Sequence, residues 1–268
     1  MAELELGLIF YGLIVGLGAG LIGGTLAGLA GVGGGLIYVP LFYAFMPFDS
    51  EGMAIHIFAS MVAVVATAFF SARAHLRLGH VDISSMLALL PGLVIGAALG
   101  LWSTLQLPQF WILLGIAALN GWVAFDYGRK HRPHVKQAYA MQLLSGPIGY
   151  ISGLLGIGGG TMLVPLLRRF VHLRQAVGTS AMCGLIMATG AVLLNLSLES
   201  DWGGLLVQHW QFLAGAWVGI MLILPFASGW AARLHDSVEE VALRFALKTV
   251  FISLALALSV AAFLSVHL

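Results

Sequence analysis

Long unbroken apolar stretches dominate the pattern of hydrophobic and polar positions along the chain. Six of them contain about 20 residues each, enough to cross roughly 30 Å of hydrocarbon as a helix. They lie at 54–72, 84–105, 109–127, 176–198, 209–230 and 245–266. This pattern predicts an all-α integral membrane protein.

Two further apolar segments, 6–46 and 139–170, are interrupted by glycine clusters. The clusters have one form, GxGGG followed five residues later by proline: Gly31 to Gly35 with Pro40, and Gly156 to Gly160 with Pro165. Such a run cannot hold a continuous helix, because glycine weakens helices and proline has no N–H to donate. Each segment is therefore predicted to be a helical hairpin that breaks at its glycines.

The placement of charge predicts which connections face the cytoplasm. Lys and Arg gather in a few places: Arg73, Arg77, 129–136, 168–174, Arg233, Arg244 and Lys248. By the positive-inside rule these lie in the cytoplasm. The remaining connections are acidic or uncharged, so both termini are expected in the periplasm of a bacterial inner membrane. The acidic start of the chain does not resemble a cleavable signal peptide.

This topology makes the two halves inverted repeats. Segment 139–170 has a basic cluster at each end, and about 32 residues of helix measure roughly 48 Å, short of the roughly 60 Å of two spans. It is expected to re-enter the side that it left, as is segment 6–46. A hairpin plus three spans crosses the membrane an odd number of times. We assign residues 1–128 to the first repeat, 129–138 to a basic cytoplasmic linker and 139–268 to the second repeat, with chance similarity of glycine-rich helices as the alternative.

Composition excludes a soluble protein and gives no sign of an enzyme. The chain is 60 % hydrophobic and 9 % charged, its net charge is +1, and its mean hydropathy is +1.00. The glycine clusters lack the Lys-Ser/Thr of a nucleotide-binding loop, and neither HExxH nor GxSxG is present. We expect no catalysis, cofactor, metal site or nucleic-acid partner.

Broken helices at membrane depth occur where they line a cavity or face other protein. A helix that restarts after a break directs free N–H groups and a positive dipole end at that point, which suits an anion. The candidate binding residues are the glycines and hydroxyls around the two breaks: Gly33, Gly34, Gly35, Leu36, Ser60, Gly158, Gly159, Gly160, Thr161, Thr179 and Ser180. For the hydroxyls, bonding to a carbonyl of their own helix is the alternative.

Three ionisable residues are candidates for gating or proton transfer. His56 is either a proton relay or, as its neighbours Asp49 and Glu51 favour, an interfacial residue. Arg73 and Arg77 either collect anions or only anchor the helix end. No buried carboxylate is evident, so coupling to protons or sodium stays open.

The chain resembles the TauE/SafE (sulfite exporter) family of membrane permeases. The resemblance rests on the two GxGGG…VP elements, the stretch from Arg73 to Asp82, and Gly178-Thr-Ser180; the first half departs from the family pattern with Phe58-Ala-Ser60. It implies a secondary transporter, in the direction of export, for small sulfur-containing anions such as sulfite, thiosulfate or sulfonates like sulfoacetate. A passive anion channel and a non-transporting binding or scaffold subunit are the alternatives, and a homodimer in the lipid bilayer is left open.

Overall fold

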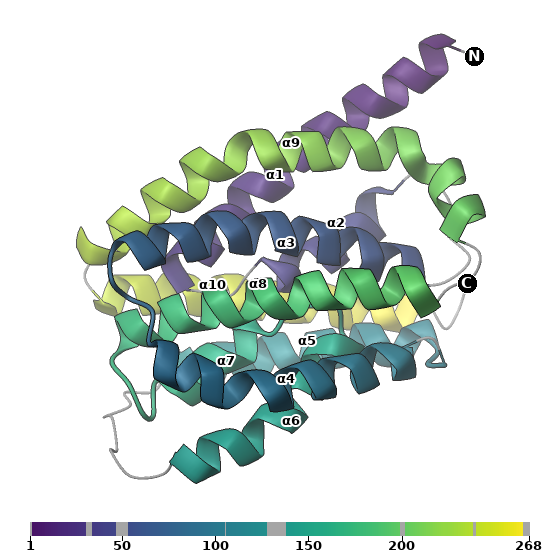
Figure 1. The fold of residues 1–268 in the computed structure, drawn as a ribbon. Coiled ribbons are helices and arrows are strands. Elements are labelled where there is room, and N and C mark those ends of the chain that lie inside the picture. Colours follow the sequence, from purple (N-terminus) through teal and green to yellow (C-terminus); the bar gives the residue numbers. More distant parts are fainter. Residues whose placement is uncertain are drawn as a thin grey trace.

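The protein is a bundle of α-helices (Figure 1). A computed structural model describes residues 2–30, 34–46, 53–104, 106–127, 138–198, 202–237 and 240–264. Within these ranges the chain forms ten helices and no strand. They are α1 (Ala2–Ala30), α2 (Gly35–Phe45), α3 (Ala54–Arg77), α4 (Ile83–Thr104), α5 (Gln109–Tyr127), α6 (Ala138–Leu154), α7 (Gly160–Leu167), α8 (Leu173–Leu198), α9 (Trp202–Ser237) and α10 (Glu240–Leu264).

Six of these helices are long and apolar enough to cross a membrane: α1, α3, α4, α5, α8 and α9. Large apolar side chains such as Val207, Phe226 and Phe245 are largely exposed on the outside of the bundle. Such a surface suits hydrocarbon rather than water. The prediction of an all-α integral membrane protein is confirmed.

The set of six differs from the sequence prediction in two helices. α1 was expected to be one arm of a hairpin, yet its 29 residues form an unbroken helix of full spanning length. Glycines at four-residue intervals, Gly12, Gly16 and Gly20, pack against α9, so they serve an interface rather than a break. The described apolar part of α10, Lys248–Phe263, is shorter than the other spans.

Both glycine clusters interrupt the helical backbone. α1 ends at Ala30 and α2 begins at Gly35, while α6 ends at Leu154 and α7 begins at Gly160. With 11 and 8 residues, α2 and α7 measure about 16 and 12 Å, too short to cross roughly 30 Å of hydrocarbon. In Figure 1, α2 turns back toward the end from which α1 starts and α7 toward the end from which α6 starts, and these two ends are opposite.

The helix packing has an internal correspondence between the first five helices and the last five. α1 packs along α9 as α6 packs along α4, and α2 contacts α3 as α7 contacts α8. The pairs α3 with α8 and α5 with α10 join the two sets. If each helix of the first set is replaced by the corresponding helix of the second set, and the reverse, the same packing pairs result.

Glycines let the α1–α9 and α4–α6 pairs approach closely. A Cβ atom on Gly16 would overlap the Ala216 carbonyl of α9, and one on Gly96 of α4 would overlap the Gly146 carbonyl of α6. Small residues at helix interfaces bring backbones together and increase van der Waals contact in membranes. Each hairpin is thus held along its longer arm by one spanning helix.

The two ends of the bundle differ in charge. The start of α1 and the end of α10 lie toward one end (Figure 1). The connections α3–α4 and α7–α8 lie at the other end, where the Asp82 backbone N–H donates to Thr179 Oγ1 over 2.9 Å. Arg77 and Arg169 are exposed there. The basic connections therefore gather at the end opposite to both termini.

Candidate functional site

The two helix breaks meet inside the bundle. Gly35, the first residue of α2, packs against the backbone of Ile157 in the α6–α7 break. A Cβ on Gly35 would lie 2.5 Å from the Ile157 oxygen and 2.6 Å from its Cα, so only glycine fits. Both residues are buried. The fold thus brings together the two clusters that the sequence analysis matched as repeats.

The breaks use backbone conformations that favour glycine. Gly34 has a φ of 74°, and Gly156, Gly158 and Gly159 have φ values of 69°, 69° and 72°. Side-chain-bearing residues adopt this left-handed region at a cost, whereas glycine does so freely. Gly31 and Gly33, also candidates from the sequence, lie outside the described residues.

Two helices begin beside this junction. Gly34 caps α2 and Gly159 caps α7, and neither contributes a side-chain hydrogen bond. The first N–H groups of a helix have no intrahelical acceptor, and the N-terminus carries a partial positive charge. The start of the second arm of each hairpin therefore offers N–H donors to an anion without a cationic side chain.

The prolines lie inside the second arms rather than in the breaks. Pro40 is the sixth residue of α2 and Pro165 the sixth of α7. A proline removes the hydrogen bond to the carbonyl four residues earlier, which here is that of Leu36 and Thr161. Both carbonyls follow the glycines directly, so the breaks leave acceptors as well as donors near the junction.

Two of the predicted serine hydroxyls reach the second glycine cluster. Ser180 Oγ on α8 donates to the Gly160 carbonyl over 2.9 Å. Ser60 Oγ on α3 donates to the Gly156 carbonyl over 3.4 Å. Both serines are fully buried. These two hydrogen bonds hold the backbone of the break from α3 and from α8.

Thr161 carries a buried hydroxyl next to the second break. It is the second residue of α7, and it is fully buried. Its Oγ1 has no hydrogen-bond partner in the described part of the chain. A buried hydroxyl without a partner costs free energy, so Thr161 could donate a hydrogen bond to a ligand at this position.

Thr179 does not join the junction. Its Oγ1 accepts the Asp82 N–H, and the backbone of its neighbour Gly178 packs against the His80 carbonyl. The structure therefore places Thr179 at the basic end of the bundle, where it fixes the α3–α4 connection to α8.

Sequence reasoning missed two buried hydroxyl residues beside the breaks. Tyr38 packs its ring over Gly34, and its hydroxyl lies 2.6 Å from Thr67 Oγ1. Ser152 is buried in α6, and its hydroxyl has no partner among the described residues. Both could have been found from their positions in the sequence, because each hydroxyl residue lies within one or two helical turns of a glycine cluster in otherwise apolar sequence.

One expectation about ionisable residues was wrong, since no buried carboxylate was evident from the sequence. His56 is buried near the start of α3, where its ring packs edge-on against Tyr43 with 5.6 Å between centroids, and its role as a proton relay or an interfacial residue stays a prediction. A buried carboxylate does exist: Asp126 at the end of α5 lies 3.6 Å from Arg168 at the end of α7, and both are buried. The helix end that holds Asp126 is covered by the second hairpin, which sequence alone does not show.

Arg73 and Arg77 lie away from the junction, toward the basic end of α3. Ser60 and Arg73 are 13 positions apart on that helix, which corresponds to about 20 Å. Among the described residues, no group of three or more His, Cys, Asp or Glu side chains could hold a metal ion.

Comparison with known proteins identifies related membrane proteins. Residues 16–260 match the family described as "Sulfite exporter TauE/SafE". A "Probable membrane transporter protein" of Haemophilus influenzae is 28 % identical over 205 residues, covering 72 % of this chain and 76 % of that protein. The "Probable membrane transporter protein YunE" of Bacillus subtilis is 26 % identical over 234 residues, covering 75 % and 83 %. No solved structure matches this chain.

Proposed function

We propose, from the premise that this chain belongs to the sulfite exporter TauE/SafE family, that it is a secondary transporter that exports small sulfur-containing anions. The family consists of membrane transporters, and the six spanning helices make this chain a multi-pass membrane protein. Sulfite, thiosulfate and sulfonates such as sulfoacetate are the proposed substrates, because each presents several anionic oxygens to N–H and O–H donors.

The proposed binding site is the junction of the two breaks. Oxygens of the anion would accept hydrogen bonds from N–H groups in the first turns of α2 and α7, other than the Gly160 N–H, which donates to the Gly158 carbonyl. The buried, unpartnered hydroxyl of Thr161 is the observation that carries this proposal. Ser60 and Ser180 would support the backbone that holds the anion, and Tyr38 would close the side nearest Gly34.

Alternating access is the proposed mechanism, and it depends on the two halves being inverted repeats. The hairpins start from opposite ends of the bundle (Figure 1), and exchanging the two sets of five helices reproduces the main packing pairs. Movement of the hairpins relative to α3 and α8 would expose the junction first to one end and then to the other. With the basic end in the cytoplasm, both termini would lie in the periplasm.

Transport by purified protein in lipid vesicles tests this function. Labelled sulfite, thiosulfate and sulfoacetate are each presented on one side, with the same unlabelled anion on the other. A secondary transporter gives saturable flux and counterflow, whereas a passive channel gives flux that does not saturate. If the flux of every anion equals that of empty vesicles, the result contradicts transport and favours a binding or scaffold subunit.

A matched pair of glycine variants links transport to the junction. Gly159→Val places a branched side chain at a left-handed φ against Met187, so transport should be abolished. Gly18→Val changes an exposed glycine of α1 with open space around it and should leave transport intact. Equal transport by both variants, in protein that is folded in the membrane, would contradict the proposed site.

A further inference from the structure

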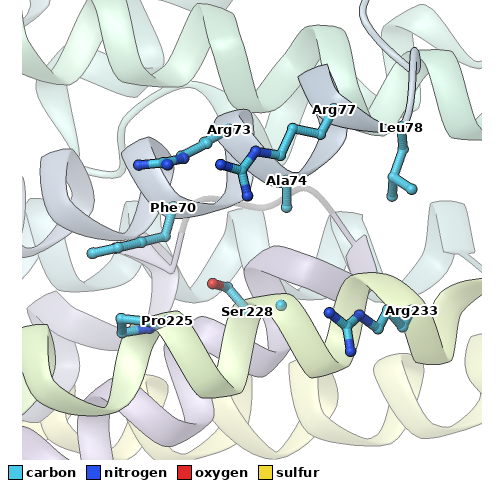
Figure 2. Close-up of a pocket in the computed structure, with 9 residues that line it drawn as sticks. Phe70, Arg73, Ala74, Arg77, Leu78, Pro225, Ser228 and Arg233 are labelled. Carbon is cyan, nitrogen blue, oxygen red and sulfur yellow. The ribbon is translucent and has the colours of Figure 1, made fainter.

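A cavity of about 360 Å³ lies between α3 and α9 at the basic end of the molecule. Figure 2 shows Arg73 and Arg77 of α3 on one side and Ser228 and Arg233 of α9 on the other. The guanidinium of Arg77 and the Ser228 side chain point into the space between the two helices. We refer to this cavity as the arginine pocket.

Among the described residues that line it, the arginine pocket has three positive charges and no acidic side chain. Arg73, Arg77 and Arg233 are exposed, and in the described part of the chain none of them forms an ion pair. Three guanidinium groups around one cavity repel one another unless an anion lies between them. Arginine binds phosphate oxygens through two parallel N–H groups, so a phosphate suits this set.

An apolar groove continues from the arginine pocket along α3. A second cavity, of about 510 Å³, shares Phe70 with the pocket. Its walls come from α3, α8 and α9 and are almost entirely apolar: Val62, Val65, Ala66, Phe69, Phe70, Leu185, Thr189, Val192, Leu193 and Met221.

The pocket and the groove form one continuous surface. On α3 the lining positions Val62, Ala66, Phe69, Arg73 and Arg77 recur every three or four residues, which places them on one face of the helix. The lining positions of α9 follow the same spacing from Met221 to Arg233. The arginine pocket therefore opens into the apolar groove, which runs along the axis of α3.

This surface is separate from the anion junction. The face of α3 that carries Ser60, Val64 and Thr67 is turned toward the junction and its surroundings. Val62, Ala66 and Phe69 each follow those residues by two positions, a rotation of about 200° around the helix. A soluble anion that moves toward the junction would gain nothing from contact with an apolar groove on the opposite face of α3.

We propose that this surface binds an acidic phospholipid of the leaflet at the basic end, with its phosphate in the arginine pocket and one acyl chain in the apolar groove. Basic pockets between transmembrane helices suit the head groups of acidic lipids. The groove would contact the acyl chain of a lipid, whereas a free phosphate has no apolar part to place there. The bound lipid would hold α3 and α9 together at this end.

Lipid titration of the full-length protein in detergent, followed by native mass spectrometry, tests the proposal. Phosphatidylglycerol should bind at least tenfold more tightly than phosphatidylcholine with the same chains. The triple variant Arg73→Gln, Arg77→Gln, Arg233→Gln should lose this preference, with each single variant losing about fivefold. Arg169→Gln removes an exposed charge at the same end, outside the pocket, and should keep the preference.

Two further arms separate a lipid site from a phosphate site. Ala66→Phe fills the groove and should weaken phosphatidylglycerol binding while the arginines remain. Inorganic phosphate and glycerol 3-phosphate should compete only weakly with the lipid. Phosphate that binds as tightly as phosphatidylglycerol, or phosphatidylcholine that binds equally well, would overturn the proposal. The single arginine variants serve as the test if the triple variant loses its folded state.

Discussion

At the scale of single residues, Thr161 connects the structure to the proposed chemistry most directly. We predict that Thr161→Val keeps or raises the melting temperature, because a buried hydroxyl without a partner costs about 1–3 kcal/mol. The same variant should raise the KM for the anion about tenfold or more, since a hydrogen bond to a charged group contributes about 1.5–3 kcal/mol. Initial rates in vesicles and thermal unfolding in detergent measure the two effects.

Thr249→Val is the matched control for this prediction. The Thr249 hydroxyl donates to the Phe245 carbonyl on an exposed part of α10, so its loss should leave the KM unchanged. A Thr161→Val protein with a lower melting temperature and an unaltered KM would show that the hydroxyl supports the fold and does not bind the anion.

The buried pair of Asp126 and Arg168 gives a second prediction at this scale. Asp126→Asn leaves Arg168 charged and buried next to a neutral partner. Breaking a buried pair in this way destabilises a protein by about 3–5 kcal/mol. The double variant Asp126→Asn, Arg168→Met should recover much of that loss, because it removes both charges of the pair. Thermal unfolding of the two single variants and the double variant checks this, and additive losses would contradict the coupling.

At the scale of helices, the α4–α6 interface depends on the absence of side chains on its glycines. A Cβ on Gly96 would overlap the Gly146 carbonyl and lie 2.7 Å from the Tyr150 nitrogen. We predict that Gly96→Ala lowers the melting temperature, because two backbones must separate to make room. Differential scanning fluorimetry of the purified protein measures this change.

Gly121→Ala makes the same substitution on α5, where the added Cβ meets open space. Its melting temperature should stay the same or rise, because alanine is favoured over glycine in helices by about 1 kcal/mol. Opposite signs for the two variants would show that contact, rather than helix propensity, decides the effect. Two shifts of the same sign would contradict the close packing of α4 against α6.

The helical elements also show which features could be predicted from the sequence. The break before Gly35 and the break at Gly156–Gly160 follow from local backbone chemistry, so both could be located from the sequence. Pro40 and Pro165 lie inside α2 and α7, so the glycines rather than the prolines mark where the helices break. Local patterns gave the elements but not their exact ends.

Contacts between distant elements could not be predicted. The pairing of Asp126 with Arg168 depends on how the second hairpin covers the end of α5, and the burial of His56 depends on Tyr43. The matched glycine clusters were an exception, since residues around both were predicted to bind the anion, and Gly35 does contact Ile157. Tyr38 and Ser152 were missed because neither belongs to the repeated motif.

At the scale of the whole molecule, the charge difference between the two ends makes a prediction about orientation. Cys183 is the only cysteine of the chain and is buried, so Cys183→Ala gives a background without reactive thiols. Gln106 lies between α4 and α5, and Arg169 lies between α7 and α8 at the basic end; both are exposed. In this background a membrane-impermeant maleimide should label Gln106→Cys in intact cells and Arg169→Cys only in inside-out vesicles.

The labelling result bears directly on alternating access. The proposed mechanism requires the α1–α2 hairpin to start from the periplasm and the α6–α7 hairpin from the cytoplasm. Each hairpin would then control access to the junction from one side of the membrane. Arg169 follows the second hairpin, and its labelling side therefore reports the side from which that hairpin starts. Labelling of both cysteines from the same side would remove the inversion and with it the mechanism. Labelling of Arg169→Cys from outside and Gln106→Cys from inside would keep the mechanism but reverse the molecule, because the basic end would then face the periplasm against the positive-inside rule.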